Sequence, residues 1–353
     1  MRVAVVAQRS PDAGGDAVER LRRTARLLGE RGHEVTVFCS KWWDAYGDER
    51  TEGNVRYVAV TEPGASPWLF AVTLPWLLAR YRPEVVYAGY VPPAQVLGAK
   101  VAGAILRAPV LVDWYGDRKR PGSERTRRLA LRFADRVVVP SRVVETWVRE
   151  LGADGDDVTV VPESVDMSLV RNLPSFGDAD VVYARELDAD ANLESVLLAL
   201  AELRERDWSA VVIGDGPERD RYEAQAADLR IDDRVQFVGD QPPEDRIARY
   251  RGGHVFVQTA ERESFARELL WALAAGCVGV VEYQAESSAH ELVEHRDRGI
   301  RTTSDRELSD AIVSAGGMDR ADVNEVFADF DQDVVVERYI RLFREVRESF
   351  GLV

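Results

Sequence analysis

The sequence predicts an α/β protein made of two domains, each with a parallel β-sheet. Near the N-terminus, a short apolar run (residues 3–7) is followed by an amphipathic helical pattern (17–32) and a second apolar run (35–39). A strand–helix–strand unit of about thirty residues implies a parallel pair of strands. The same alternation begins again at residue 181, and a chain of 353 residues is too long for one compact core but suits two domains.

Further strands and helices follow in the first half of the chain. Apolar runs predict strands at residues 55–60, 84–88 and 109–112, with helices at 94–106 and 143–151 and a last strand at 158–162. Residues 41–54 are polar, with aromatic side chains embedded, and no element is expected there. The connection to the second half is placed at residues 166–178, where Pro174 and Gly177 interrupt a stretch without helical or strand period.

Residues 67–78 are apolar on nearly every face. The segment is too short to span a bilayer, and its prolines, Pro67 and Pro75, interrupt it. Two interpretations stay open. The segment is either a core helix of the first domain or an exposed apolar face that docks on lipid, with Trp68 and Trp76 at the interface.

The second half alternates in the same way. Strands are expected at 181–184, 210–213, 255–258 and 277–281, and helices at 192–206 and 219–229. A charged loop, residues 261–264, leads into a helix with an inward face at Phe265, Leu269 and Leu273 that stops at Gly276. The last helix, 334–349, has one apolar stripe.

Charge and composition narrow the function. The formal net charge is −15, and lysine occurs only at Lys41, Lys100 and Lys119. Such a balance argues against non-specific nucleic-acid binding. It favours a halophilic source, because concentrated salt screens the repulsion between acidic groups; an acidic enzyme from a GC-rich genome is the alternative.

The cysteines and the N-terminus bear on compartment. Cys39 and Cys277 lie far apart in the sequence, so neither a disulfide nor a zinc site is expected. The opening residues read as a short strand and not as a secretory signal, and no run has the length of a membrane span. We therefore expect a cytoplasmic protein, with peripheral contact at the inner face of the membrane as a further expectation.

The loop at 261–264 is the first candidate for a site. It follows a buried strand and precedes a helix, which is where open α/β sheets hold anionic ligands. Glu263-Ser264-Phe265-Ala266, followed by Ala272, Ala274 and Gly276, resembles the donor-site segment of family 4 glycosyltransferases. That family typically shows Glu-Gly-Phe-Gly, four residues, a second Glu and then Ala-x-Ala-x-Gly.

The resemblance implies a fold and an activity. The fold is GT-B, with two Rossmann-like domains (residues 1–165 and 166–333) facing across a cleft, and a C-terminal helix (334–353) that crosses back to the first domain. The activity is retaining transfer of a sugar from a nucleotide-sugar to a glycan or lipid-linked acceptor. No cofactor or metal is required, because an arginine, a lysine and helix N-termini neutralise the leaving diphosphate.

The resemblance also assigns roles to residues. Glu263 matches the glutamate that contacts the donor sugar, and Arg185 matches the arginine at the diphosphate. The remaining residues implied in nucleotide-sugar binding lie on glycine turns and at the start of the donor-loop helix: Gly15, Gly214, Asp215, Gly216, Gly239, Ser264, Phe265, Ala266 and Arg267. A glutamate so placed also has a plainer interpretation, as the cap of the following helix.

Three positions depart from the family pattern. Ala191 stands where the lysine is expected, and Arg267 is the candidate to replace that charge. Trp271 stands in place of the second glutamate, so ribose recognition by that carboxylate is lost. No histidine lies at the strand end where the family places one near the acceptor; Asp113 is the candidate there, with Asp117 as the alternative.

A basic run follows Asp113. It contains Arg118, Lys119, Arg120, Arg125, Arg127, Arg128, Arg132 and Arg136, a local reversal of sign in an acidic chain. Arginine forks suit phosphate oxygens. The run is therefore either a solvated helix face paired with carboxylates or a surface for an acceptor that carries phosphate.

The leading hypothesis is thus a retaining glycosyltransferase. Because of the three departures, a non-catalytic GT-B protein that binds a nucleotide-sugar or a partner enzyme is the alternative, and a sugar-nucleotide epimerase on the same fold is a lesser one. A dehydrogenase is disfavoured, because no Gly-x-Gly-x-x-Gly follows the first strand.

Overall fold

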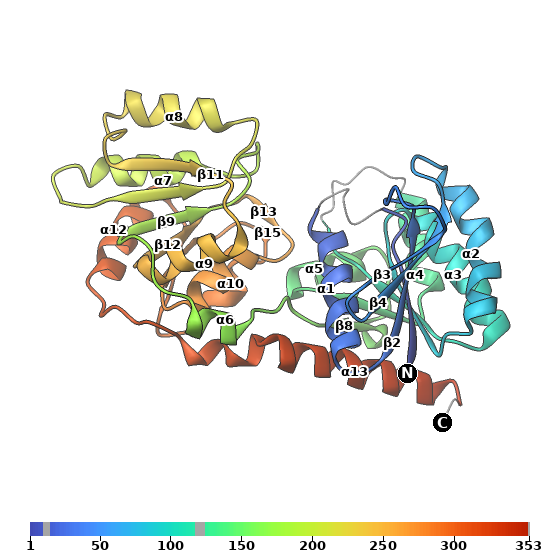
Figure 1. Ribbon diagram of the computed structural model, residues 1–353. Helices are drawn as coiled ribbons and strands as arrows, with labels where there is room; N and C mark the ends of the chain where they lie inside the picture. Colours follow the sequence, from blue (N-terminus) through green and yellow to red (C-terminus); the bar gives the residue numbers. More distant parts are fainter. Residues whose placement is uncertain (10–14, 117–123, 352–353) are drawn as a thin grey trace. The chain divides into compact units, whose positions relative to one another are not determined.

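The computed structural model describes residues 1–9, 15–116 and 124–351 and divides into two compact units. Unit 1 consists of Met1–Glu163 together with Asp333–Val353, and unit 2 consists of Ser164–Gln332. The division falls after residues 163 and 332, whereas the sequence analysis places it after residues 165 and 333. Figure 1 shows the two units as separate sheets flanked by helices.

Unit 1 is built on an eight-stranded sheet with the order β3-β4-β2-β1-β5-β6-β7-β8. All neighbouring strands run parallel except β3, which pairs antiparallel with β4 at the edge. The strands are β1 (Arg2–Val6), β2 (Glu34–Ser40), β3 (Glu49–Glu52), β4 (Val55–Thr61), β5 (Val85–Gly89), β6 (Val110–Asp113), β7 (Arg136–Val139) and β8 (Val158–Val160). The strand β3 lies in the polar stretch where no element was expected.

Helices cover both faces of this sheet. One face packs against α1 (Asp16–Glu30) and α13 (Gln332–Ser349), and the other packs against α2 (Pro67–Tyr81), α3 (Pro93–Leu106), α4 (Glu124–Phe133) and α5 (Arg142–Glu150). A short 3-10 helix, Gly155–Asp157, precedes β8. Ser66 and Ser141 cap α2 and α5 by accepting from the backbone N–H three residues on.

The last helix belongs to the core of unit 1. Val335, Tyr339, Phe343 and Val346 of α13 recur at three- and four-residue spacing and are buried against β1, β2 and α1. Figure 1 shows α13 running beside these elements. The expected return of the final helix to the first domain is therefore confirmed.

Unit 2 is built on a six-stranded, all-parallel sheet with the order β11-β10-β9-β12-β14-β16. Its strands are β9 (Val181–Ala184), β10 (Ala210–Ile213), β11 (Val235–Gly239), β12 (Val255–Gln258), β14 (Val278–Glu282) and β16 (Gly299–Thr302). Its helices are α6 (Met167–Asn172), α7 (Leu193–Glu202), α8 (Arg219–Asp228), α9 (Pro243–Gly252), α10 (Arg267–Ala274), α11 (His290–Val293), α12 (Asp305–Gly316) and the 3-10 helix Glu325–Phe330. One part of the core lies between the sheet and the helices α7, α8 and α12, and buried residues of α9 and α10 form another part.

Three local expectations are corrected. The helix α2 continues through Pro75 to Tyr81 and is not interrupted there. The predicted linker contains α6, which Asp166 caps through the Leu169 N–H at 2.9 Å. The charged loop at 261–264 contains a short strand, β13 (Arg262–Glu263), paired in parallel with β15 (Glu286–Ser287).

Both sheets have the doubly wound arrangement that the sequence predicts. In each, the chain first proceeds outward in one direction and then returns to continue in the other, so that β1 and β5 in unit 1, and β9 and β12 in unit 2, lie at the change of direction. Ligands of such sheets bind outside the carboxyl ends of the strands at that point. The α/β class, with two parallel-sheet domains, is thus confirmed.

Candidate active site

The switch point of unit 2 brings together the two residues to which the sequence analysis assigns the main roles. Arg185 directly follows β9, and Glu263 lies on β13, in the loop after β12. The Nη1 of Arg185 donates to the Glu263 carboxylate and, at 3.3 Å, to the Arg262 carbonyl oxygen. Its Nη2 lies 3.5 Å from the Asp188 carboxylate.

The Arg185–Glu263 pair is largely withdrawn from water. The two side chains are 15% and 16% exposed, so their attraction is screened less than that of a surface pair. Burial alone would lower the pKa of Arg185, but the Glu263 carboxylate, together with Tyr183 and Asp188, outweighs it and raises the pKa of the guanidinium. Arg185 is therefore a permanent cation at this edge of the sheet.

The backbone of Glu263 is held by the second, two-stranded sheet. Residues 262 and 263 pair with residues 286 and 287, and the Ser288 N–H donates to the Glu263 carbonyl at 2.9 Å. The helix α10 that follows has Ala266 at its N-cap and no side-chain cap. The interpretation of Glu263 as a helix cap is therefore wrong.

A second arginine accompanies Arg185. The Nε of Arg262 donates to Asp190 at 3.0 Å, and the guanidinium lies 4.0 Å from Glu286. The Arg262 carbonyl accepts from Arg185, so the two residues are in direct contact. Arg262 thus places a second positive charge beside the loop after β9, a position that the sequence analysis did not assign to it.

The loop after β9 also contains the position of the missing lysine. Ala191 is fully buried in the core of unit 2, and its carbonyl accepts from the Tyr183 hydroxyl at 2.6 Å. The next residue, Asn192, has φ +49° and donates to the Thr259 carbonyl and the Glu282 carboxylate, both at 3.1 Å. These bonds tie the loop after β9 to the ends of β12 and β14.

The glycine turn after β10 presses against this loop. Gly214 (φ +128°) and Gly216 (φ +158°) have no room for a Cβ, which would lie 2.0 Å from the Arg185 carbonyl and 2.5 Å from the Leu187 carbonyl. Gly214 also bridges to Gly239 through an N–H···O bond of 2.9 Å, and Asp215 accepts from the Gly216 N–H at 2.8 Å. The structure thus gathers these four predicted residues behind Arg185.

The start of α10 follows Glu263 directly. Phe265 and Ala266 are buried, while Ser264 is half-buried. Arg267, the expected substitute for the lysine, pairs with Glu268 at 3.3 Å. Glu268 also accepts from the Tyr250 hydroxyl at 2.6 Å and pairs with Arg246 at 3.3 Å, so this carboxylate is held against α9.

The switch point of unit 1 has its own pocket, between the ends of β1, β5 and β6. It is lined by Ala7, Arg9, Gly15, Val18, Leu21, Gly89, Tyr90, Val91 and Asp113, among others. Gly15 is the N-cap of α1, with φ +96° and no side-chain cap. Two predicted residues, Gly15 and Asp113, therefore meet in this pocket, whereas Asp117 and the basic residues 118–120 lie outside the described residues.

Asp113 is not free to act alone. Both its oxygens lie near the Nε of Arg20, at 3.1 and 3.2 Å, and the two side chains are 1% and 2% exposed. Burial raises the pKa of Asp113, and the Arg20 cation opposes that rise. The structure therefore places Asp113 in an ion pair with Arg20 on the pocket wall, and its catalytic role stays a prediction.

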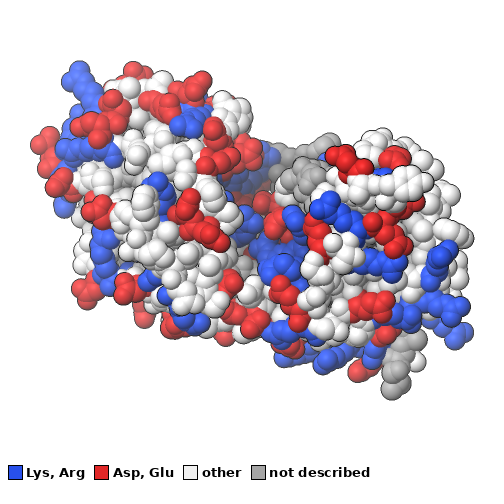
Figure 2. Space-filling view, in the orientation of Figure 1, with Lys and Arg blue, Asp and Glu red and all other residues white. Residues whose placement is uncertain are grey.

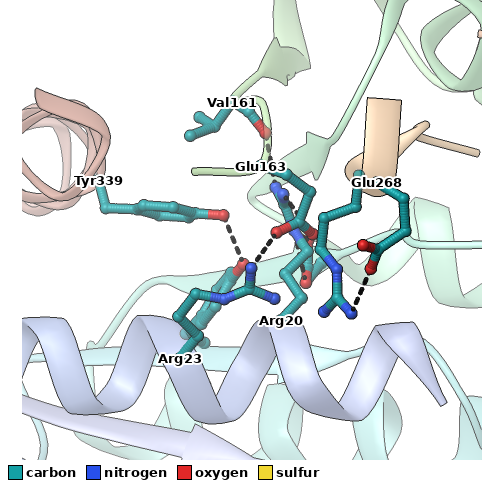
Figure 3. A network of polar contacts seen from close by, with 9 residues as sticks. Arg20, Arg23, Val161, Glu163, Glu268 and Tyr339 are labelled. Carbon is teal, nitrogen blue, oxygen red and sulfur yellow. Dashed lines mark hydrogen bonds and ion pairs between the residues drawn. The ribbon is translucent and has the colours of Figure 1, made fainter. Parts of the chain in front are cut away.

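Arg20 is the centre of a buried network. It donates to the Val161 carbonyl at 2.7 Å and to Glu163 at 3.4 Å, and Glu163 also pairs with Arg23 at 3.0 Å. Figure 3 shows Arg20 and Arg23 on α1 directed toward Glu163, with Tyr339 of α13 nearby. The Arg20 guanidinium lies 5.7 Å from the Tyr339 ring centre. The network joins four segments that are distant in sequence, and the helical pattern of α1 gave no signal for it.

Among the described residues, no histidine lines the pocket of unit 1 and no metal-binding group is found. Of the four histidines, only His33 belongs to unit 1, and it lies beside the N-terminal amine at 3.2 Å, at the opposite edge of the sheet. Among the described residues, no three His, Cys, Asp or Glu side chains are grouped to hold a metal. Cys39 and Cys277 are separate, buried thiols.

The family comparisons match both units. The model "Glycosyl transferase 4-like domain" matches residues 15–163, and the model "Glycosyl transferases group 1" matches residues 171–316. The chain is therefore a glycosyltransferase of the family 4 type.

Individual relatives are distant. A GDP-mannose-dependent alpha-(1-6)-phosphatidylinositol monomannoside mannosyltransferase of Mycobacterium tuberculosis is 24% identical over 338 residues, 88% of this chain and 85% of the relative. A 2-deoxystreptamine glucosyltransferase of Streptomyces kanamyceticus is 27% identical over 165 residues, 42% of this chain and only 43% of the relative. The Anabaena protein HepE, solved in complex with UDP, has a TM-score of 0.75 at 16% identity and covers 98% of this chain and 100% of that one. This likeness establishes the GT-B fold.

Proposed function

We propose that this protein transfers a sugar from a nucleotide-sugar to a hydroxyl of a glycan or lipid-linked acceptor, with retention of the anomeric configuration. The single observation that carries the proposal is the Arg185–Glu263 pair at the switch point of unit 2. A cation and a carboxylate at that edge suit the two ends of a nucleotide-sugar, the diphosphate and the hexose. The Mycobacterium relative and HepE, with a GDP-sugar and UDP in their names, support a nucleotide-sugar donor.

The proposed chemistry depends on the interactions that strengthen as the nucleoside diphosphate departs. The bond between the anomeric carbon and the diphosphate breaks, and negative charge develops on the diphosphate. The acceptor hydroxyl oxygen forms the new bond to the anomeric carbon on the same face, and its proton passes to the departing diphosphate oxygen. The Arg185 and Arg262 guanidiniums, together with the N-terminus of α10, stabilise that charge without a metal. Once the diphosphate takes over bonds from Arg185, the Glu263 carboxylate accepts hydrogen bonds from the sugar hydroxyls.

The pocket of unit 1 is the proposed acceptor side. Backbone at Gly15 and the apolar side chains of Val18 and Leu21 border it, and Asp113 forms part of its wall. Because Arg20 holds both oxygens of Asp113, this carboxylate orients the wall and does not remove a proton. The proposal includes a cytoplasmic location for the protein, at the inner face of a membrane that holds the acceptor.

A panel of nucleotide-sugars tests the function. We expect one donor to be hydrolysed slowly without acceptor, Glu263→Gln to abolish this, and Arg185→Gln to weaken nucleoside diphosphate binding. The control is Glu223→Gln, a half-buried residue of α8 that pairs only with Arg219 among the described ion pairs. Failure of every donor to bind would refute the proposal.

A non-catalytic, donor-binding role is the second candidate. It is favoured by Ala191, which stands where the family has a lysine. Because Ala191 is short and fully buried, no movement of its side chain can supply the missing charge. In that case the wild-type protein binds a nucleotide-sugar but releases no sugar under any condition. Hydrolysis or transfer by the wild type rejects it.

A further inference from the structure

The outer surface of α2 and α3 in unit 1 is one continuous face. The two helices pack so closely that a Cβ at Gly98 of α3 would lie 2.5 Å from the Ala71 carbonyl of α2. The residues of α2 that face inward, Phe70, Leu74 and Leu78, fill the core beneath. The backbones of α2 and α3 therefore meet directly at Gly98, and we take the outward residues of the two helices as one surface.

That surface is apolar where a water-exposed helix is ordinarily polar. Trp68, Val72 and Trp76 follow one another at four-residue spacing on α2 and are 65%, 76% and 66% exposed. Ile105, at 68%, and Val101 continue the surface on α3. We call Trp68, Leu69, Val72, Trp76, Val101 and Ile105 the apolar face. An apolar face of this kind on a soluble domain marks an interaction site.

All charged residues of α2 and α3 are basic. The sequences of α2 and α3 contain no Asp or Glu, although the chain has 61 of them and a net charge of −15. Their only charged residues are Arg80, which ends the Trp68–Val72–Trp76 stripe, and Lys100. Arg82 and Arg107 are exposed at the two C-caps.

The neighbouring helix α4 extends this basic border. It packs against α3 and exposes Arg125, Arg128 and Arg132 at three- and four-residue spacing, with Leu129 between them. Arg128 pairs with Glu124, the one acidic residue of the helix. Figure 2 shows basic side chains gathered at the lower right of unit 1, where α2 ends. We call Arg80, Arg82, Arg107, Arg125, Arg128 and Arg132 the basic border.

We propose that the apolar face and its basic border dock on the surface of a bilayer that contains anionic phospholipid. Tryptophan is favoured at the headgroup level, where its ring is buried and its N–H stays wet, and aliphatic side chains beside it enter the acyl boundary. Arginines on the same side then pair with lipid phosphates. No helix of the described residues is long and apolar enough to cross a membrane, so the contact is with one leaflet.

Charge favours a bilayer over a second copy of the chain. A twofold dimer through the apolar face would bring the basic border of one copy against that of the other, and like charges oppose such an interface. An anionic surface has the complementary sign. The inference deepens the proposed function, since docking would bring the enzyme to a lipid-linked acceptor, but docking itself is measured without donor or acceptor.

Vesicle flotation with the full chain tests the proposal. Vesicles of anionic phospholipid, vesicles of zwitterionic phospholipid and buffer alone are compared at the lowest salt that keeps the far-UV circular dichroism of the folded protein. We expect flotation with anionic vesicles, and a partition coefficient at least tenfold lower for Trp68→Gln/Trp76→Gln. Replacing Arg125 and Arg132 by glutamine lowers the coefficient by about fivefold each.

The control variant is Tyr46→Gln/Val326→Gln, which removes two apolar side chains of comparable or greater exposure elsewhere (107% and 63%) and leaves flotation unchanged. Absence of flotation in the wild type, or equal loss in the control, overturns the proposal. So does a tryptophan-dependent dimer seen by light scattering without lipid. The tryptophan and arginine variants leave the proposed donor site of unit 2 intact, so we expect them to hydrolyse the nucleotide-sugar in solution as the wild type does. This readout distinguishes a failure of docking from a failure of the proposed function.

Discussion

Arg262 and Arg267 give a direct test of which arginine supplies the second cation of the proposed donor site. Arg262 contacts Arg185 through its carbonyl and lies beside Asp190, whereas Arg267 pairs with Glu268. Replacement of either by glutamine keeps most of the side-chain length and removes one charge. We therefore expect Arg262→Gln, and not Arg267→Gln, to weaken nucleoside diphosphate binding.

The magnitude follows from the bond that is lost. A hydrogen bond to a charged group contributes about 1.5–3 kcal/mol, which corresponds to roughly 10- to 150-fold in the dissociation constant. The lower end applies here, because Arg262 gives up its bonds to Asp190 and Glu286 when it turns to a phosphate. We expect about tenfold weaker binding for Arg262→Gln and less than about twofold for Arg267→Gln.

Titration calorimetry with UDP and GDP measures both variants against the wild type. Arg262→Lys should recover part of the loss, because lysine restores the charge but not the forked geometry. A larger effect of Arg267→Gln than of Arg262→Gln would refute the reasoning and restore the assignment made from the sequence. Equal thermal stability of the two variants guards against an indirect effect.

Two further predictions concern the free energy of unfolding. Arg20→Met leaves the carboxylates of Asp113 and Glu163 buried with one fewer cation and should lower the free energy of unfolding by about 3–5 kcal/mol. Arg26→Met, on the same helix but in an exposed pair with Glu30, should lower it by less than about 1 kcal/mol. Urea unfolding compares the two variants, and equal losses would contradict a buried network. Burial, with Arg320 nearby, lowers the pKa of His254 from its usual 6.5, so the folded state binds this proton less readily than the unfolded state. Stability should therefore be full above about pH 6.5 and fall as the pH decreases below it, with a shallower fall for His254→Asn than for the exposed-site control His295→Asn.

The central strands of the sheets could be predicted from the sequence because burial alone determines that their residues are apolar. The expected strands at 210–213 and 255–258 have the bounds of β10 and β12, since each is an apolar run between polar or glycine neighbours. Edge elements could not be predicted in this way. β3 consists of Glu-Arg-Thr-Glu and is exposed, so pairing with β4, and not burial, makes it a strand.

The same limit explains what was missed at the candidate site. β13 is two residues long, has no period, and exists because residues 286–287 lie beside it, more than twenty positions away in the chain. The sequence analysis therefore named Arg267 alone as the substitute cation, and the charged loop at 261–264 gave no signal for Arg262. Only the pairing of β13 with β15 fixes Arg262 beside Asp190.

Arg20 shows why a buried polar residue escapes sequence patterns. Helical period places Arg20 on the inward face of α1 with Thr24 and Leu28, but an arginine is ordinarily solvated, as Arg22 and Arg26 of the same helix are. Its partners Asp113 and Glu163 are 93 and 143 residues away, and neither is recognisable as a partner until the sheet places them. Burying one cation is favourable only because two carboxylates and a carbonyl oxygen surround it. The buried strands and helices are thus predictable from the local sequence pattern, whereas the partners of the ionic groups that line the pockets are determined by the topology.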